Sequence, residues 1–337
     1  MSKLRVVIAN VCRLLLALTL ILSGYVKAID PLGTQYKITD YLAAIDLAAM
    51  VPQWTTLSAA VALAAIEFAL GVFLLFAIKR QFTSRLTLAF MAVMTLITVW
   101  IYIADPVKDC GCFGDAFTLT NGETLLKNIL LVLCAAVVAW RPADMVRLIS
   151  SSNQWLVMNY AVVYIIGTSL WCLYTLPTFD FRPYHIGVNI KQDMTVPEGA
   201  PQTEYETTFI MKKKEFTADN YPDSTWQFVD ARTVVTKQGY EPPIHDFIID
   251  SATTGEDITD SILSRPGYTF LLVAPSLARA DDSNFGDIDQ IYEYAQEQGA
   301  AFYCLTASTD KDIARWRDIT GAEYPFCLSD ETTLKTI

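Results

Sequence analysis

Five long apolar segments constrain the fold of this 337-residue chain more than any other feature. A helix rises about 1.5 Å per residue, so about 20 apolar residues cross the hydrocarbon core of a bilayer. We therefore predict an all-α membrane bundle of about five transmembrane helices in residues 1–176, with the lipid bilayer as its surroundings. The segments are 6–29, 55–78, 84–104, 123–140 and 155–176.

Basic residues predict how these helices are oriented. If the N-terminus lies inside, the two outer loops, 30–54 and 105–122, contain only Lys37 and Lys108 as basic residues. The inner segments then hold most of the others, which are Lys3, Arg5, Lys79, Arg80, Arg85, Arg141 and Arg147. Basic residues favour the cytoplasmic side of a membrane. The pattern predicts a cytoplasmic N-terminus and places everything after residue 176 on the outer side of the membrane.

The remainder of the chain has a different character. Residues 177–337 carry a net charge of −14, which argues against a nucleic acid partner. Residues 177–240 read as a linker and a β-rich segment, and residues 241–337 alternate strand-like and helix-like patterns. That alternation predicts an α/β domain with a mostly parallel sheet. Strands are expected at 206–211, 225–235, 245–250, 268–274 and 301–307, and helices at 285–299 and 309–321.

Charged residues inside the apolar segments are candidate functional residues, because an ionised side chain in a bilayer needs a partner or a wet cavity. Arg13 and Glu67 lie in the first and second segments, and their counted depths would allow an ion pair. The pair would be a proton or ligand site, or only a structural contact. Lys27 and Asp30 are three residues apart at the outer end of the first segment, where they could pair on one face.

The stretch "DCGCFGD" contains the most specific motif, Cys110 and Cys112 around one glycine. Glycine allows a ring this small to close, and a strained, exposed disulfide is readily reduced. Lys108 and Lys127 are placed to stabilise a thiolate. A redox pair, a static turn or disulfide, and soft-metal binding all remain open. A closed zinc site is disfavoured, because it needs about four ligands and both histidines lie in the other domain.

The first 140 residues resemble a known family. "RLLLALTLILSGYVKAIDPLG", "IEFALGVFLL" and "CGCFG" before a helix with "LLKN" are similar to the DoxX/MauE family of small bacterial membrane proteins. The resemblance implies a link to methylamine utilisation, where disulfide formation needs periplasmic thiol chemistry, or to quinone-coupled oxidation. A membrane quinone is thus one candidate cofactor. Three aromatic residues near the outer helix ends would line its pocket or form an interfacial belt: Trp100, Tyr102 and Trp171.

The last hundred residues resemble a second family. "PPIHDFIIDSATTGEDITDSILSRPGYTFLLVAP" is similar to the opening of TlpA-like and peroxiredoxin-like thioredoxin folds. The turn that would carry CxxC reads "APSLARADDS", so the domain resembles a degenerate thioredoxin fold. The fold's final proline loop and hairpin do not follow, which suggests a portion of a longer chain. Three further cysteines are secondary thiols or core residues: Cys172, Cys304 and Cys327. The resemblance implies that Cys304 and Cys327 lie on neighbouring strands.

These patterns support two functions. In the first, Cys110 and Cys112 exchange electrons at the outer face with a partner thiol protein or a membrane quinone, in the maturation of extracytoplasmic proteins. In the second, the thioredoxin-like domain binds a client protein without catalysis, and the helices only anchor it. A metal site and a transport pathway are less favoured, the latter because no inverted repeat is evident.

Overall fold

The computed structural model describes residues 3–337 apart from 106–110, 118, 198, 202–203, 212–213, 218–227, 238, 241 and 246. For residues 204–211, 214–217 and 228–237 only the backbone is described. The chain forms two compact units, Met1–Arg182 and Pro183–Ile337.

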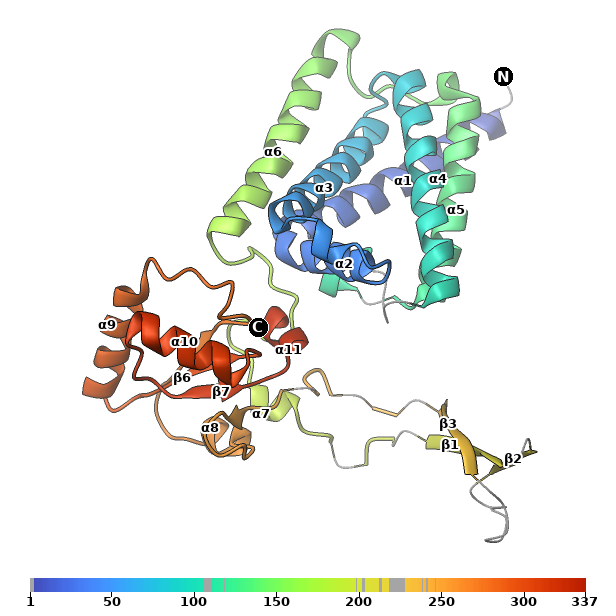
Figure 1. Ribbon diagram of the computed structural model, residues 1–337. Helices are drawn as coiled ribbons and strands as arrows, with labels where there is room; N and C mark the ends of the chain where they lie inside the picture. The colour runs from blue at the N-terminus through green and yellow to red at the C-terminus, as the bar shows by residue number, and fades with distance from the viewer. Residues whose placement is uncertain are drawn as a thin grey trace. The chain divides into compact units, whose positions relative to one another are not determined.

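The first unit is a helical bundle (Figure 1). Five of its helices are long and apolar enough to cross a membrane, which confirms the five predicted spans. Side chains on the outside of the bundle are apolar, as contact with lipid requires; Val93, Leu96 and Ile103 on the third span are examples. The five helices are α1 (Lys3–Ile29), α3 (Gln53–Leu75), α4 (Arg80–Ala104), α5 (Asn121–Trp140) and α6 (Gln154–Tyr174).

Two glycines bring α1 and α3 into close antiparallel contact. A Cβ atom on Gly24 would lie 2.5 Å from the backbone nitrogen of Phe68, and one on Gly71 would lie 2.7 Å from that of Ile21. Small residues allow membrane helices to approach this closely, and dispersion contacts then hold them together. The α1–α3 pair is therefore packed backbone to backbone, with no room for a side chain at either glycine.

A helix follows α1 in the segment 30–54, which was predicted only as an outer loop between two spans. Helix α2 (Pro31–Ala43) begins at a proline, which is tolerated in the first helical turn. Asp30 caps it, because its Oδ1 accepts a hydrogen bond from Gly33 N at 2.9 Å. Gln35 fastens α2 to the start of α3 by donating to the carbonyl of Gln53 at 3.1 Å. The connecting segment 30–54 therefore contains a helix, which was not predicted from the sequence.

The N-terminus, the α3–α4 turn and the α5–α6 connection lie at one end of the bundle, called here the N-terminal end (Figure 1). The opposite end carries α2 and the segment between α4 and α5, which contains a short 3-10 helix, Gly114–Ala116. Between the two ends, a core of small and branched side chains joins α1, α3, α4 and α5. It includes Leu16, Leu20, Leu70, Leu74, Met91, Leu131 and Val138.

The second unit contains a small mixed α/β region. Its four-stranded sheet has the order β4-β7-β6-β5, in which β5, β6 and β7 are parallel and β4 is antiparallel. Helices α9 (Phe285–Glu297) and α10 (Asp310–Thr320) connect the parallel strands, as the predicted alternation required. The strands are β4 (Asp250–Ser251), β5 (Thr269–Val273), β6 (Ala301–Thr306) and β7 (Phe326–Leu328). Three short helices complete it: α7 (Ile190–Asp193), α8 (Thr259–Leu263) and α11 (Glu331–Thr336).

A separate antiparallel sheet precedes this region, with the order β2-β1-β3. It comprises β1 (Glu204–Met211), β2 (Lys214–Thr217) and β3 (Phe228–Lys237). Strands β1 and β3 correspond to the strands predicted at 206–211 and 225–235, and β2 was not predicted.

Among the described residues of the strand predicted at 245–250, only Asp250 lies in a strand, and the prediction is wrong for the others; residue 246 lies outside the described residues. Phe247 and Ile249 are buried while Ile248 is exposed, which gives the sequence its strand-like alternation. No described ladder pairs this segment, and Ile249 N instead donates to the side chain of Thr259 at 2.7 Å. The alternation of buried and exposed residues in this segment therefore comes from core packing and not from strand pairing.

Candidate functional site

A buried ion pair lies where α1 and α3 approach the cysteine-containing loop. Lys27 on α1 and Glu67 on α3 are 5% and 2% exposed, and Lys27 Nζ lies 2.8 Å from Glu67 Oε2. The same ammonium donates to Ser23 Oγ at 2.7 Å and to the carbonyl oxygen of Cys112 at 2.6 Å. A lysine has three N–H donors, and here each has an acceptor. Buried charges of this kind are tolerated when they are paired and hydrogen-bonded.

Ser23 extends this network. Its hydroxyl oxygen lies 2.7 Å from Glu67 Oε2 and also 2.7 Å from the carbonyl oxygen of Cys112. Because a hydroxyl has one hydrogen, it donates to one of these acceptors at a time. Lys27 and Ser23, both on α1, therefore hold the backbone of the loop at Cys112, and Glu67 on α3 binds both of these side chains.

The loop itself turns sharply on two glycines. Gly111 and Gly114 have φ values of +61° and +53°, which glycine adopts without steric cost. Gly114 N donates to the carbonyl of Gly111 at 3.1 Å, which closes the turn. The stem of Lys37 on α2 also lies against Gly111, where an added Cβ would be 3.1 Å from Lys37 Cγ. Gly111 is thus required by both its backbone angle and its contact with α2.

Two lysines approach the loop from different helices. Lys127 on α5 has its Nζ 4.3 Å from the ring centroid of Phe113, the residue after Cys112. This is a cation–π contact, and it brings the predicted basic residue to the loop. Lys37 was missed by the sequence analysis, because residues 30–54 were interpreted as a loop and not as a helix. Cys110 and Lys108 lie outside the described residues.

The structure corrects the expected Arg13–Glu67 pair. Gly71 on α3 lies against Ala17 on α1, and the two helices are antiparallel. Glu67 lies one helical turn from this contact towards the C-terminal end of α1, whereas Arg13 lies one turn from it towards the N-terminal end of α1. They are about two turns apart, about 11 Å along the axis. Arg13 donates instead to the carbonyl of Val146 at 2.5 Å. The depth count failed because α3 begins beyond the end of α1, alongside α2.

The expected pairing of Lys27 with Asp30 is also replaced. Lys27 turns towards Glu67, and the carboxylate of Asp30 caps α2. Ser23, four residues before Lys27, lies on the same face of α1 and takes the place expected for the acid. The spacing in "SGYVK" could have indicated Ser23, but a serine inside an apolar helix carries no specific signal.

The secondary thiols are buried and distant in sequence from the loop. Cys172 on α6 is 6% exposed, with its Sγ 3.7 Å from Thr178 Oγ1. Cys304 and Cys327 lie on the adjacent parallel strands β6 and β7, as the resemblance implied. However, Cys327 is in register with Leu305, so Cys304 and Cys327 project from opposite faces into different hydrophobic clusters. They are therefore not placed to form a disulfide.

Burial also makes the two strand cysteines poor nucleophiles. Loss of solvation, with a smaller effect from the neighbouring Cys327, raises the pKa of Cys304 to about 12. Burial raises the pKa of Cys327 to about 11. The thiolate is the reactive form, so very little of either cysteine is reactive near neutral pH.

We expect neither strand cysteine to react with iodoacetamide at pH 8 in the folded chain, and both to react once the chain is unfolded in guanidinium. Mass spectrometry of peptides from native and denatured samples would measure this. Rapid modification of Cys304 or Cys327 in the native sample would contradict the structure of this sheet.

The soft-metal alternative for Cys110 and Cys112 includes a residue outside the described ones, Cys110. Among the residues that the structure describes, no group of three or more histidine, cysteine, aspartate or glutamate side chains lies close enough to hold a metal ion.

Comparison with known families bears on the helical unit. Residues 5–141 match the family described as methylamine utilisation protein MauE. This part of the chain is a MauE family domain. It covers α1 to α5, so α6 and the second unit lie beyond it. Residues 205–238, which contain the β1–β3 sheet, match a domain of unknown function (DUF8463). No curated protein and no solved structure matches the chain.

The MauE domain therefore contains the whole network described above. Lys27, Glu67, Ser23 and Cys112 all fall within the matched residues. The chain has five helices that are long and apolar enough to cross a membrane, and four of them lie in this domain. The chain is therefore a membrane protein.

Proposed function

We propose that the MauE domain takes part in thiol–disulfide exchange through Cys110 and Cys112. The observation that carries this proposal is the buried Lys27–Glu67 pair, whose ammonium binds the backbone of Cys112. A buried ion pair is a costly way to stabilise a fold, and a hydrophobic pair often does so equally well. Such a pair is better explained by the need to fix the loop's position, as a reactive group requires.

The chemistry needs a partner that exchanges two electrons. In one direction a thiolate of the pair attacks a partner disulfide and forms a mixed disulfide, which the second cysteine resolves. Cys110 and Cys112 then form a disulfide, and the partner leaves with two thiols. Overall, two electrons and two protons pass to the partner, and the reverse direction oxidises it. Lys37 and Lys127 supply positive charge near the loop, which favours the thiolate.

The partner is a thiol protein outside the cytoplasm, with a membrane quinone as the other candidate acceptor. The basic residues favour a periplasmic position for the loop and a cytoplasmic N-terminus in a bacterial inner membrane. Disulfides persist in the periplasm. The MauE description links the family to methylamine utilisation, and maturation of an extracytoplasmic protein is the role that fits this location.

Differential alkylation of native membranes tests this function. We expect Cys110 and Cys112 to change between an oxidised and a reduced form when membranes are treated with dithiothreitol, read by mass spectrometry. Cys304 and Cys327 in the same sample are the internal control, since they are buried and should not change. The proposal fails if Cys110 and Cys112 stay in one state, and if serine at both positions leaves the oxidation state of client proteins unchanged.

A second candidate function rests on the α/β region. Its parallel β5, β6 and β7 with connecting helices are compatible with a thioredoxin-like domain, and no cysteine follows β5 in "APSLARADDS". Such a domain would bind a client without exchanging thiols. Capture of a client by residues 183–337 of the full chain, unaffected by serine at Cys110 and Cys112, would favour this function over the first.

A further inference from the structure

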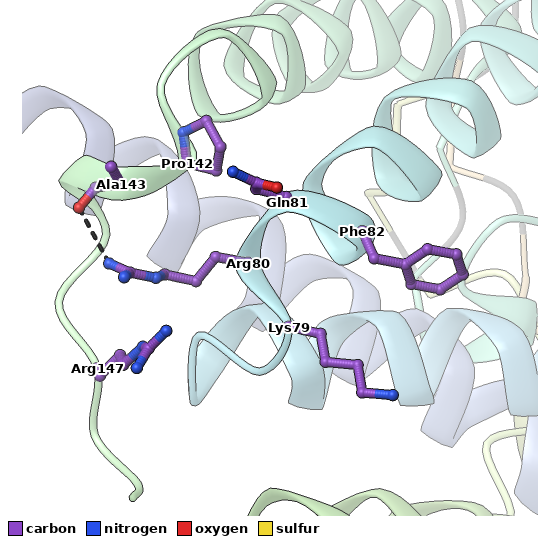
Figure 2. Close-up of a pocket in the computed structure, with 7 residues that line it drawn as sticks. All are labelled: Lys79, Arg80, Gln81, Phe82, Pro142, Ala143 and Arg147. Atoms are coloured by element: carbon purple, nitrogen blue, oxygen red, sulfur yellow. Dashed lines mark hydrogen bonds between the residues drawn. The ribbon is translucent and has the colours of Figure 1, made fainter. Parts of the chain in front are cut away.

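A cavity of about 380 Å³ opens at the N-terminal end of the bundle, between the start of α4 and the loop that follows α5. Three basic residues line it: Lys79 and Arg80 at the start of α4, and Arg147 after α5. In Figure 2, Arg80 and Arg147 lie near each other, and Lys79 extends in another direction. Phe82 and Pro142 form an apolar part of the wall. No acidic residue is among the described residues that line it.

The guanidinium groups have donors to spare. One nitrogen of Arg80, Nη1, donates to the carbonyls of Ala143 at 3.0 Å and Met145 at 2.8 Å. Arg147 Nη1 donates to Ser151 Oγ at 3.2 Å. A guanidinium has five N–H donors, so most of them remain for a ligand. Within the described residues, none of the three basic side chains makes an ion pair.

The wall opposite α4 is held in place by α1. Asn10 donates to the carbonyl of Asp144 at 3.0 Å and accepts from Val146 N at 3.1 Å. Arg13 is buried and donates to the carbonyl of Val146. Since Arg80 binds the same loop, the two sides of the cavity are fixed to each other. A fixed wall reduces the entropy lost when a ligand binds.

We propose that this cavity binds a phosphate group, either of an anionic phospholipid or of a free phosphate ester. Planar guanidinium groups match phosphate oxygens in geometry and charge, and two of them meet here without a carboxylate. Helix α4 adds a weaker attraction, because the side chain of its N-cap residue, Lys79, makes no capping hydrogen bond; Gln154 Oε1 accepts only from Lys79 N, at 3.2 Å. Exposed apolar side chains nearby suit the acyl chains of a lipid; Phe82, Val146 and Leu148 are 66%, 51% and 56% exposed. The site does not depend on the function proposed for the cysteine pair.

Titration of the full chain in dodecyl maltoside micelles tests this site. The probes are dioctanoyl phosphatidylglycerol, inorganic phosphate, and dioctanoylglycerol, which lacks the phosphate. We expect phosphatidylglycerol to bind and dioctanoylglycerol not to bind. The double variant Lys79→Gln/Arg147→Gln should bind phosphatidylglycerol about tenfold more weakly, as loss of charge-assisted hydrogen bonds implies. Arg80 is left unchanged, because it also holds the loop.

Arg85→Gln is the matched control. Arg85 is an exposed basic residue on the same helix and is not among those that line the cavity, so its loss should change the affinity less than twofold. Competition by inorganic phosphate would support a free phosphate ester as ligand, and binding without competition would support a lipid headgroup. The proposal is overturned if neither phosphate probe binds, or if the double variant and Arg85→Gln weaken binding equally. Equal unfolding temperatures would exclude misfolding.

Discussion

Replacement of Lys27 by methionine is expected to destabilise the MauE domain by about 3–5 kcal/mol, because it leaves the carboxylate of Glu67 buried without a cation. The carbonyl of Cys112 also loses its ammonium donor. Unfolding of the purified chain in mixed micelles, followed by tryptophan fluorescence, would measure the loss. The affected residues lie in the bundle, so the change should appear in the transition of that unit.

Two further variants separate the ion pair from a general effect of losing a charge. Arg85→Met removes an exposed charge from the same bundle and should change the stability by less than about 0.5 kcal/mol. Lys27→Met/Glu67→Leu removes both charges and should regain most of the lost stability, since an apolar pair replaces the ion pair. A single Lys27→Met variant as stable as the wild type would show that the buried pair does not support the fold.

The double variant also tests the link to the loop. Lys27→Met/Glu67→Leu should be stable, but only Ser23 would still donate a hydrogen bond to the carbonyl of Cys112. We expect faster alkylation of Cys112 than in the wild type, because the loop is less firmly held. Unchanged alkylation would mean that the ion pair stabilises the helices without positioning the loop.

Replacement of Gly24 by leucine is expected to have a comparable effect, a loss of about 3 kcal/mol or more. A Cβ at this position would lie 2.5 Å from Phe68 N and 2.8 Å from the carbonyl oxygen of Ala64, so the two backbones must separate. Separation of α1 from α3 would also lengthen the distance between Lys27 and Glu67. Both the unfolding midpoint and the alkylation rate of Cys112 should change in the same variant.

Gly167→Ala on α6 is the matched control for this substitution. Nothing lies within 4 Å of a Cβ atom at Gly167, so alanine meets no obstacle there and improves the helix propensity. Its stability should equal or slightly exceed that of the wild type. If Gly24→Leu were tolerated as well as Gly167→Ala, the close α1–α3 crossing would be wrong.

The five spans were predictable because each is a local property of the chain. A run of about 20 apolar residues can satisfy its backbone in a bilayer only as a helix, whatever surrounds it. The helices of the α/β region followed in the same way from their own periodicity and from the glycines that end them. The segment at 245–249 shows the limit of this reasoning, because its alternation arises from burial of Phe247 and Ile249 without strand pairing.

The members of the candidate site were predictable as types of residue, but their partners were not. Lys27 and Glu67 stood out because charges are rare in apolar spans, yet Lys27 was assigned to Asp30, and Glu67 to Arg13. Ser23 gave no specific signal, because a serine in an apolar helix has no single role, and Lys37 gave none because residues 30–54 were interpreted only as an outer loop. Which charged residues pair depends on how far one helix is displaced along its axis relative to its neighbour, and the sequence of a single helix does not determine this displacement.

The sequence by itself determined that this chain enters a membrane, where its spans lie, and that a two-cysteine loop joins two of them. Each follows from short-range composition and spacing. Only the tertiary structure decided that Lys27 reaches Glu67 and the backbone of Cys112, and that Cys304 and Cys327 face opposite sides of a sheet. The physical reason is that the first contact depends on which residues of α1 and α3 lie opposite each other, which the close packing at Gly24 and Gly71 fixes. The second depends on the register between β6 and β7. Both are relations between segments far apart in the chain.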